Sequence, residues 1–545
     1  MERPDLVFTG GRIFPADGQP PVDGAVAVRA GRIVAVGDGD VRGLAGPDTR
    51  VVDLAGGLLI PGFVDAHVHP VQGGLERMRC DLTDYGTREA YLDAIRSYAD
   101  ANPDAEWITG GGWSMAAFAG GTPVAADLDA VVPDRPVFLP NRDHHGAWVN
   151  SRAMELAGLD ADPPDPPDGR LERDADGRPT GTLHEGAMDL VGRLAPEPTY
   201  DEWMAALLGA QTYLHSLGIT AWQDAIVGEY TNIVDSADVY VDAARDDRLT
   251  ARVTGALWWD RERGAEQIPD LVARRERLRA GRFRITSVKV MQDGVAENFT
   301  AGMLEPYLDG DGRPTGNAGL SFVDPTALKE YVTTLDSEGF QVHVHAIGDR
   351  AVREALDAFA AAAWTNPPSD RRHHIAHIQV IHPDDVPRFA ILGVTANMQP
   401  LWAAHEAQLD ELTLPFLAEP RASWQYPFGA LAASGARLAA GSDWPVSSPN
   451  PLEGIHVAVN RRLPEDGPDV PVLLPEQRLD LAAALTAYTA GSARVAHHDD
   501  SGVIAPGRLA DLAVLDRDPF AGPPEEIAAT RVVATYVEGE PVFEA

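Results

Sequence analysis

Between residues 61 and 497, short apolar runs alternate with longer amphipathic segments, and this alternation constrains the fold more than any other feature. The runs are typical of buried strands, whereas AVREALDAFAAAA and TREAYLDAIRSYADAN have the apolar spacing of helices. Such alternation predicts an α/β protein with parallel strands covered by helices, and its length fits a (β/α)8 barrel. A doubly wound sheet is the rival, but no Gly-x-Gly-x-x-Gly turn follows an early strand. The expected strands span residues 62–66, 218–223, 285–291, 341–345, 374–380, 394–398 and 438–440.

The two ends of the chain share a second pattern, short apolar runs separated by Gly and Asp turns. Neither end has enough strands to close a core alone. We therefore expect one β-sandwich built from residues 1–60 plus 498–545, and a barrel over residues 61–497. Residues from about 70 to 200 are too many for one βα unit, so the barrel must hold an insertion there.

Composition excludes several classes of partner. The net charge of −37 disfavours nucleic acid and anionic membranes. No apolar run reaches the roughly 18 residues of a membrane-spanning helix, and the first residues lack a signal-peptide pattern. We therefore expect a cytoplasmic protein. Cys80 is the sole cysteine, which excludes a metal site built from cysteines.

Histidines gather where the expected strands end. His67 and His69 close the run PGFVDAHVHP, and two residues apart on a strand place both imidazoles on one face. The carboxyl ends of barrel strands carry the active site. Imidazole and carboxylate ligands without thiolate indicate zinc or a similar divalent ion in an open, catalytic site, although two packed histidines would explain His67 and His69 alone. Further candidates at strand ends are His343, His345, His377 and Asp443.

The chain has two lysines, Lys289 and Lys329, and arginine supplies the rest of its 45 positive charges. Lys289 lies in the β-branched run ITSVKV, where burial of a cation is costly. A neutral lysine amine can react with CO2 to form a carbamate, an anion able to bridge two metal ions, whereas arginine stays protonated. We therefore expect Lys289 to be carboxylated. The alternative is a lysine that extends to the barrel rim or pairs with Asp293.

These residues, in this order, resemble the amidohydrolase superfamily of metal-dependent hydrolases. The stretches HVHAIGDRAV, NMQPLW, GSDWPVSSPNP and GVIAPGRLADLAVLDRDPF resemble its amidohydrolase-3 branch, which contains N-substituted formamide deformylase and YtcJ-like hydrolases. The resemblance covers nearly the whole chain and implies a distorted (β/α)8 TIM barrel with a β-sandwich from both termini. It also implies two divalent ions, with zinc as the first expectation and Mn2+, Fe2+ or Co2+ as alternatives. Carried over, His67, His69 and Asp443 bind the more buried ion, His345 and His377 bind the second, and carboxylated Lys289 bridges them.

The implied reaction is hydrolysis of a C–N amide-type bond by a metal-activated hydroxide, with Asp443 as general base. An N-substituted formamide is the first substrate class, and we expect Trp113, His145 and Trp402 to contact it. One alternative is a mononuclear hydrolase or deaminase that acts on a cyclic amide or an N-acyl amino acid. Another is a non-catalytic binding protein that keeps the barrel. A homodimer is compatible with the sequence.

The chain departs from the branch pattern at two places. Branch members often have Arg-Ile-Glu-His where this chain has HIAH, so that Ala376 replaces an acid and His374 is extra. His144 replaces a small residue beside His145. His343 is a spare ligand candidate or a packed histidine behind the ligands. The sequence assigns no role to His184, Glu185 and Asp224.

Overall fold

The computed structural model describes residues 3–37, 39–159, 163–230 and 234–545. Its centre is a sheet of eight strands in which every neighbouring pair is parallel. The two outer strands of this ladder also contact each other, so the sheet nearly closes on itself. The strands are β6 (Phe63–Val68), β13 (Ile219–Val227), β14 (Arg252–Trp258), β15 (Phe283–Met291), β16 (Gln341–Ala346), β17 (His374–His377), β18 (Thr395–Met398) and β19 (Arg437–Ala440).

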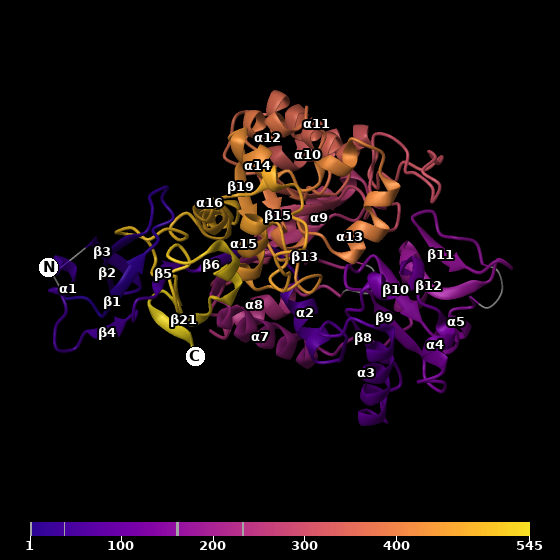
Figure 1. Ribbon diagram of the computed structural model, residues 1–545, viewed down its shortest axis with the longest axis horizontal. Helices are drawn as coiled ribbons and strands as arrows, with labels where there is room; N and C mark the ends of the chain where they lie inside the picture. Colours follow the sequence, from indigo (N-terminus) through magenta and orange to yellow (C-terminus); the bar gives the residue numbers. More distant parts are fainter. Residues whose placement is uncertain (1–2, 38, 160–162, 231–233) are drawn as a thin grey trace.

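Helices cover the outside of this sheet and bury most of the main apolar core against it (Figure 1). Their ends carry ordinary capping chemistry: Thr199 and Glu202 form a capping box on α7, and Asp324 accepts backbone hydrogen bonds at the start of α10. The helices are α2 (Pro70–Arg77), α7 (Tyr200–Ser216), α8 (Ala237–Arg245), α9 (Ile268–Arg277), α10 (Pro325–Ser337), α11 (Asp349–Thr365), α12 (Val386–Leu392), α13 (Ala407–Leu412), α14 (Phe428–Ala433), α15 (Pro451–Asn460), α16 (Leu481–Thr486) and α17 (Ser492–Val495). The α/β prediction with a parallel sheet is confirmed.

Two details of the sheet differ from the expected strands. β14 (Arg252–Trp258) was not expected, because RVTGALW contains Gly255 and lacks a clear apolar run. The strand expected to extend to residue 380 ends at His377, because His377 and Ile378 both have positive φ. That break turns the chain at the end of β17.

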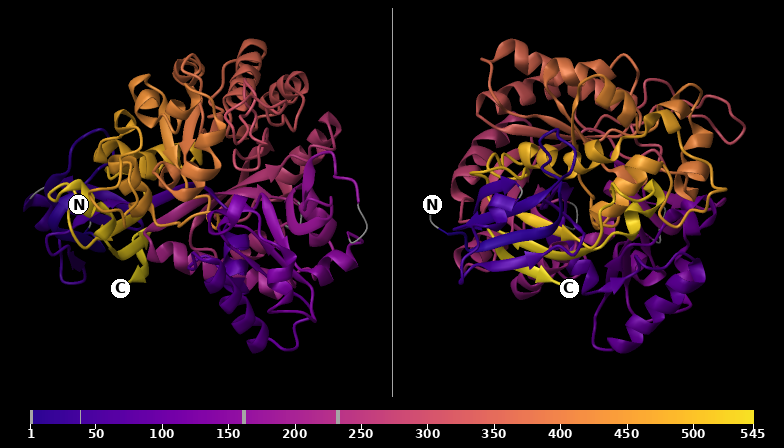
Figure 2. Two further views of the ribbon diagram at one scale, coloured as in Figure 1. Left: turned by 45° about the vertical axis from the view of Figure 1, so that its right-hand side comes forward. Right: turned by 60° about the vertical axis from the view of Figure 1, so that its left-hand side comes forward.

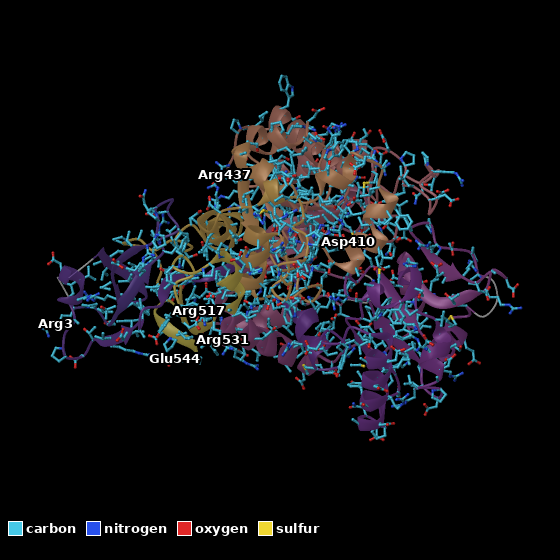
Figure 3. The ribbon with its side chains drawn as sticks, in the orientation of Figure 1. Arg3, Asp410, Arg437, Arg517, Arg531 and Glu544 are labelled. Atoms are coloured by element: carbon cyan, nitrogen blue, oxygen red, sulfur yellow. The ribbon has the colours of Figure 1, made fainter. Side chains whose placement is uncertain are left out.

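Strands from both ends of the chain join in one mixed sheet. β20 from the C-terminal segment pairs with β5 from the N-terminal segment, and Glu544 forms an ion pair with Arg50. Figure 2 shows the indigo and yellow strands side by side, and Figure 3 labels Glu544 at this end of the molecule. The hydrogen bonds define a single sheet, so the two stacked layers of a β-sandwich are not established, and the domain limits stay a prediction. The strands are β1 (Leu6–Ile13), β2 (Val22–Arg29), β3 (Arg32–Gly37), β4 (Arg50–Asp53), β5 (Leu58–Pro61), β20 (Leu512–Leu515), β21 (Val532–Val537) and β22 (Glu540–Glu544).

The segment after α2 forms a third sheet outside the barrel, on the side away from the terminal sheet (Figure 1). This sheet has apolar clusters of its own on its two faces. We call residues 80–192 the insertion. Its elements are β7 (Cys80–Asp81), α3 (Arg88–Ala101), β8 (Ile108–Gly111), α4 (Ala125–Asp129), β9 (Val137–Pro140), β10 (Gly146–Val149), α5 (Ser151–Leu156), β11 (Gly169–Arg173), β12 (Pro179–Glu185) and α6 (Asp189–Gly192). In the described part of the chain, no helix has the length and apolarity needed to cross a membrane.

Candidate metal centre

β6 delivers two histidines to the carboxyl end of the barrel. His67 lies on the strand itself, and His69 precedes α2, which begins at Pro70. The carboxylate of Asp65 accepts hydrogen bonds from His67 N at 3.1 Å and from Ser442 Oγ at 2.6 Å. Asp65 therefore ties β6 to the loop that follows β19. Asp65 stands two residues before His67, so the sequence shows an acid near the histidine. It does not show that Ser442 is the partner of this acid.

The loop after β19 carries Asp443, which lies directly against both histidines. Its Oδ1 is 3.1 Å from Nε2 of His67 and 3.0 Å from Nε2 of His69. The ligand atoms of these three residues lie within 4.8 Å of one another. Burial alone would raise the pKa of Asp443, but contacts with His67 and His69 hold it well below its usual range. The carboxyl is therefore ionised and can bind a cation.

This donor set fits a divalent ion. Two imidazole nitrogens and a carboxylate oxygen are the ligands that zinc prefers when thiolate is absent. Burial also leaves Nδ1 of His69 and Nδ1 of His377 without a hydrogen-bond partner among the described residues. Buried polar atoms without partners are rare and call for a ligand or water. The structure brings together the three residues predicted for the more buried ion.

His345 at the end of β16 and His377 at the end of β17 lie beside this group. Their ring centroids are 4.4 Å apart, and Nδ1 of His377 is 3.7 Å from Oδ2 of Asp443. Nε2 of His345 is 3.3 Å from the carbonyl of Gly294. Within the described ranges, the two histidines do not complete a second group of three ligands. The two histidines thus lie next to the first group, and a second ion stays a prediction.

Lys289 on β15 is buried among these ligands, and its side chain does not extend to the rim. Its Nζ lies 3.4 Å from Nε2 of His67. Burial lowers the pKa of Lys289 to about 7, although Asp443 acts in the opposite direction. Asp293, the alternative partner, accepts hydrogen bonds from the backbone N–H groups of residues 302, 347 and 348 instead. Burial therefore favours the neutral amine of Lys289.

A chain of buried polar side chains lies behind His67. Nδ1 of His67 is 2.9 Å from Nε2 of His343, whose ring lies 4.0 Å from that of His374. Nδ1 of His374 in turn lies 3.1 Å from Nδ2 of Asn397. A hydrogen bond on the far nitrogen fixes the orientation and tautomer of a metal-binding histidine. The arrangement places His343 behind a ligand.

A cavity of about 530 Å³ opens above the group and is lined by all six residues predicted as metal ligands. His145 and Trp402 also line it, and the Trp402 ring stacks on His377 at 12° and 5.4 Å. Trp113 lies elsewhere: it is buried in the core of the insertion, where its indole N–H donates to the carbonyl of Leu139. The expectation that Trp113 contacts substrate fails for that reason.

The insertion contributes His145, an expected substrate contact, and several polar residues without an assigned role. Nδ1 of His145 lies 2.9 Å from Oε2 of Glu185. Burial would lower the pKa of His145, but Glu185 raises it to about 9. His144 contacts Gln72 and Glu76 on α2. His184 faces away, toward Glu172 at 3.3 Å.

Asp224 lies on β13, where the barrel wall holds its carboxylate. Oδ2 of Asp224 accepts a hydrogen bond of 2.7 Å from the hydroxyl of Tyr240. Burial raises the pKa of Asp224 to about 6, against the charge of His69 and the Tyr240 hydrogen bond. Asp224 does not line the cavity described above.

Comparison with known proteins gives one consistent family. The model of the amidohydrolase family, amidohydrolase-3 branch, matches residues 50–543. Protein LONG AFTER FAR-RED 3 of Arabidopsis thaliana is 32% identical over 99% of this chain and 91% of its own length. The putative amidohydrolase YtcJ of Bacillus subtilis is 29% identical, over 91% of each chain. N-substituted formamide deformylase of Arthrobacter pascens is 26% identical over 98% of this chain and 97% of its own.

A solved structure agrees with the same assignment. An uncharacterized metal-dependent hydrolase from Pyrococcus furiosus superposes with a TM-score of 0.70 and 26% identity, over 94% of this chain and 99% of that one. The resemblance inferred from the strand-end histidines is confirmed at the level of the family branch.

Proposed function

The chain belongs to the amidohydrolase family, a family of metal-dependent hydrolases, and from this premise we propose that it hydrolyses the C–N bond of an N-substituted formamide or a related amide. The observation that carries the proposal is the convergence of His67, His69 and Asp443 at the floor of a cavity. An open site of imidazole and carboxylate ligands is the arrangement of catalytic zinc sites.

The proposed centre holds two divalent ions, zinc or else Mn2+, Fe2+ or Co2+. His67, His69 and Asp443 would hold the more buried one, and His345 and His377 the second. Lys289 would bridge them after its neutral amine adds to CO2 and loses a proton, which leaves a carbamate anion. Its burial beside His67 supports this role, because a carbamate adds negative charge among the ligands, whereas an ammonium would repel cations.

When bound, such ions would lower the pKa of coordinated water to about 7 and polarise an amide carbonyl. The proton transfers are assigned to the side chains of the protein. Asp443 lies where its second oxygen can take the proton of the attacking water and pass it to the leaving nitrogen. The amide nitrogen then leaves as a neutral amine.

The cavity wall supports an aromatic or apolar N-substituent. Trp402 lines the cavity, and its ring stacks on that of His377. Such a flat apolar wall would hold a substituent next to the reacting carbonyl. The N-substituted formamide deformylase relative supports formamides as the first class to test.

A mononuclear hydrolase or deaminase acting on a cyclic amide or N-acyl amino acid is the second candidate. It is favoured by the single three-ligand group among the described residues. In that enzyme, one ion would lie on His67, His69 and Asp443, and Lys289 would remain unmodified.

A substrate screen tests the proposal. Purified protein supplied with zinc or manganese should release formate from formanilides faster than it hydrolyses cyclic amides or N-acetyl amino acids. Hydrolysis of the cyclic amides alone would favour the second candidate. No hydrolysis of any amide by protein with bound metal would overturn both.

A further inference from the structure

The insertion holds an ion pair against the wall of the catalytic cavity. Oε2 of Glu185, at the end of β12, lies 2.9 Å from Nδ1 of His145, and Glu185 is 5% exposed. The pair is not a surface contact, since the His145 side chain is also largely buried. Because both side chains are buried, they are stabilised as a pair of carboxylate and imidazolium, and an imidazolium carries a proton on each ring nitrogen. Nδ1–H donates to Glu185, and Nε2 keeps a proton of its own.

Residues from the barrel also hold the His145–Glu185 pair in place. The hydroxyl of Thr300, in the segment after β15, donates to the other oxygen of Glu185 at 2.6 Å. Nδ2 of Asn298 donates to the carbonyl of His145 at 2.8 Å, and Glu185 N donates to that carbonyl as well at 3.0 Å. Both carboxylate oxygens and the His145 backbone are therefore fixed by two different parts of the fold.

The backbone here adopts unfavourable conformations. Glu185 has φ 52° and ψ −131°, and His144 has φ 62°. A residue other than glycine is strained in such regions, and such strain persists at functional sites where surrounding contacts enforce it. The chain carries this strain at Glu185 and at His144, the residue before His145.

The second nitrogen of His145 is free to bind. Nδ1 is taken by Glu185, whereas Nε2 has no partner among the described residues, and His145 lines the cavity. The His145 ring centroid is 5.7 Å from that of His345, one of the proposed ligands. A carbonyl group bound beside His345 thus lies within reach of the free N–H.

We propose that His145, oriented by Glu185, donates its Nε2–H to the oxygen of the scissile carbonyl and stabilises the oxyanion that forms there. Hydroxide adds to the carbonyl carbon, and the π electrons move onto the oxygen that accepts the hydrogen bond. His145 keeps its proton throughout. When the C–N bond breaks, the oxygen's electron pair restores the carbonyl and the nitrogen leaves with the proton carried by Asp443. His145 is then a catalytic residue, Glu185 is a positioning residue, and the insertion is part of the active site.

This inference rests on the proposed function, but its test can fail separately. The variants are Glu185→Gln, which keeps a hydrogen bond and removes the charge, and His145→Phe, which removes the donor. The matched control is Glu172→Gln, because Glu172 pairs with His184 in the same sheet and neither residue lines the cavity.

Kinetics on an amide that the wild type hydrolyses give the first measurement. A donor that acts mainly in the transition state lowers kcat and leaves KM nearly unchanged. We expect kcat to fall about 10²-fold in His145→Phe and about 10-fold in Glu185→Gln, with KM within about 3-fold. Glu172→Gln should match the wild type.

Binding of phenylphosphonate, a tetrahedral anion, gives a measurement independent of turnover. With metal content matched, we expect Glu185→Gln to bind it about 10-fold more weakly and Glu172→Gln to bind it normally. If the wild type hydrolyses no amide, the proposed function fails. The phenylphosphonate affinities alone then test the role of the His145–Glu185 pair.

Three results would overturn the inference. The first is wild-type kcat and phenylphosphonate affinity in Glu185→Gln. The second is a loss of metal in that variant, which would assign the pair to metal retention. The third is a wild type that does not bind phenylphosphonate.

Discussion

Nζ of Lys289 lies 3.4 Å from Nε2 of His67, with both side chains buried. Both side chains become cations when protonated, so the protonated forms of Lys289 and His67 would repel each other at this distance. Burial, and after it the charge of Lys289, lower the pKa of His67 to about 3. The pair is compatible with a metal centre in which His67 is neutral and Lys289 carries a carbamate.

Lys289→Arg should damage the enzyme more than its conservative chemistry suggests. A guanidinium stays protonated, so it would place a fixed positive charge among the metal ligands. We expect metal content below that of the wild type and a loss of activity of more than about 100-fold. Elemental analysis and kinetics on the same preparation measure both effects.

Lys329→Arg is the matched control, because Lys329 lies on the surface of α10, 3.5 Å from Asp357. It should behave as wild type. Lys289→Ala leaves a gap instead of a charge, so added short carboxylic acids should partly restore its activity. Full activity and two metals in Lys289→Arg would show that the lysine has no bridging role.

Asp443→Asn keeps the size of the side chain and removes the base. We expect kcat to fall about 10²- to 10⁴-fold while the fold stays intact, since a positioned general base contributes that much. Circular dichroism controls for folding, and elemental analysis separates loss of the base from loss of the ion. Near-normal turnover would refute the assigned role.

Trp402→Ala should act on substrate binding. Because Trp402 lines the cavity, its loss should raise KM for a formamide with an aromatic substituent and leave KM for a methyl substituent nearly unchanged. Trp113→Ala is the contrast, since Trp113 is buried in the insertion core. It should lower stability by about 3–5 kcal/mol. If Trp402→Ala changes KM equally for both substrates, Trp402 does not contact the aromatic substituent.

Buried neutral histidines should make the fold sensitive to acid. Nδ1 and Nε2 of His215 lie 2.8 Å from the carbonyl of Ile219 and the hydroxyl of Thr250, respectively. Burial lowers the pKa of His215 to about 4, against the Ile219 hydrogen bond. The unfolded chain binds a proton near pH 6.5 and the folded chain does not, so stability should fall as the pH drops below about 6.5.

The contribution of His215 to this loss should reach about 2 kcal/mol at pH 5. Denaturant unfolding at pH 7.5 and pH 5 measures it. His215→Gln cannot titrate, so its stability should fall less between these two pH values. An identical fall in variant and wild type would mean that His215 is not the source.

The candidate metal ligands could be picked out from the sequence because each strand end is a local signal. His67 and His69 have a spacing of two on one strand, and parallel strands bring their carboxyl ends together whatever the intervening chain does. The His145–Glu185 pair could not be predicted in this way. Its partners are 40 residues apart in an insertion whose register depends on its own sheet and on Thr300 from the barrel.

Other differences have equally local causes. β14 contains Gly255 and has no continuous apolar run, so its sequence does not mark it as a strand. Its pairing with β13 and β15 places it in the sheet. Trp113 looks like a cavity residue in GGGWSMAAF, but its side chain is held in the core by Leu139. The terminal strands were recognised as partners, yet their pattern did not specify one mixed sheet over two stacked ones.

Zinc titration of metal-free protein tests the central claim most directly. Protein stripped with a chelator and returned to buffer with bicarbonate should be inactive toward its amide substrate. Activity should then rise with added zinc until two equivalents per chain are bound, and Lys289→Arg should fail to reach that level. Full activity after chelation, or full activity at one equivalent in both wild type and Lys289→Arg, would contradict the account.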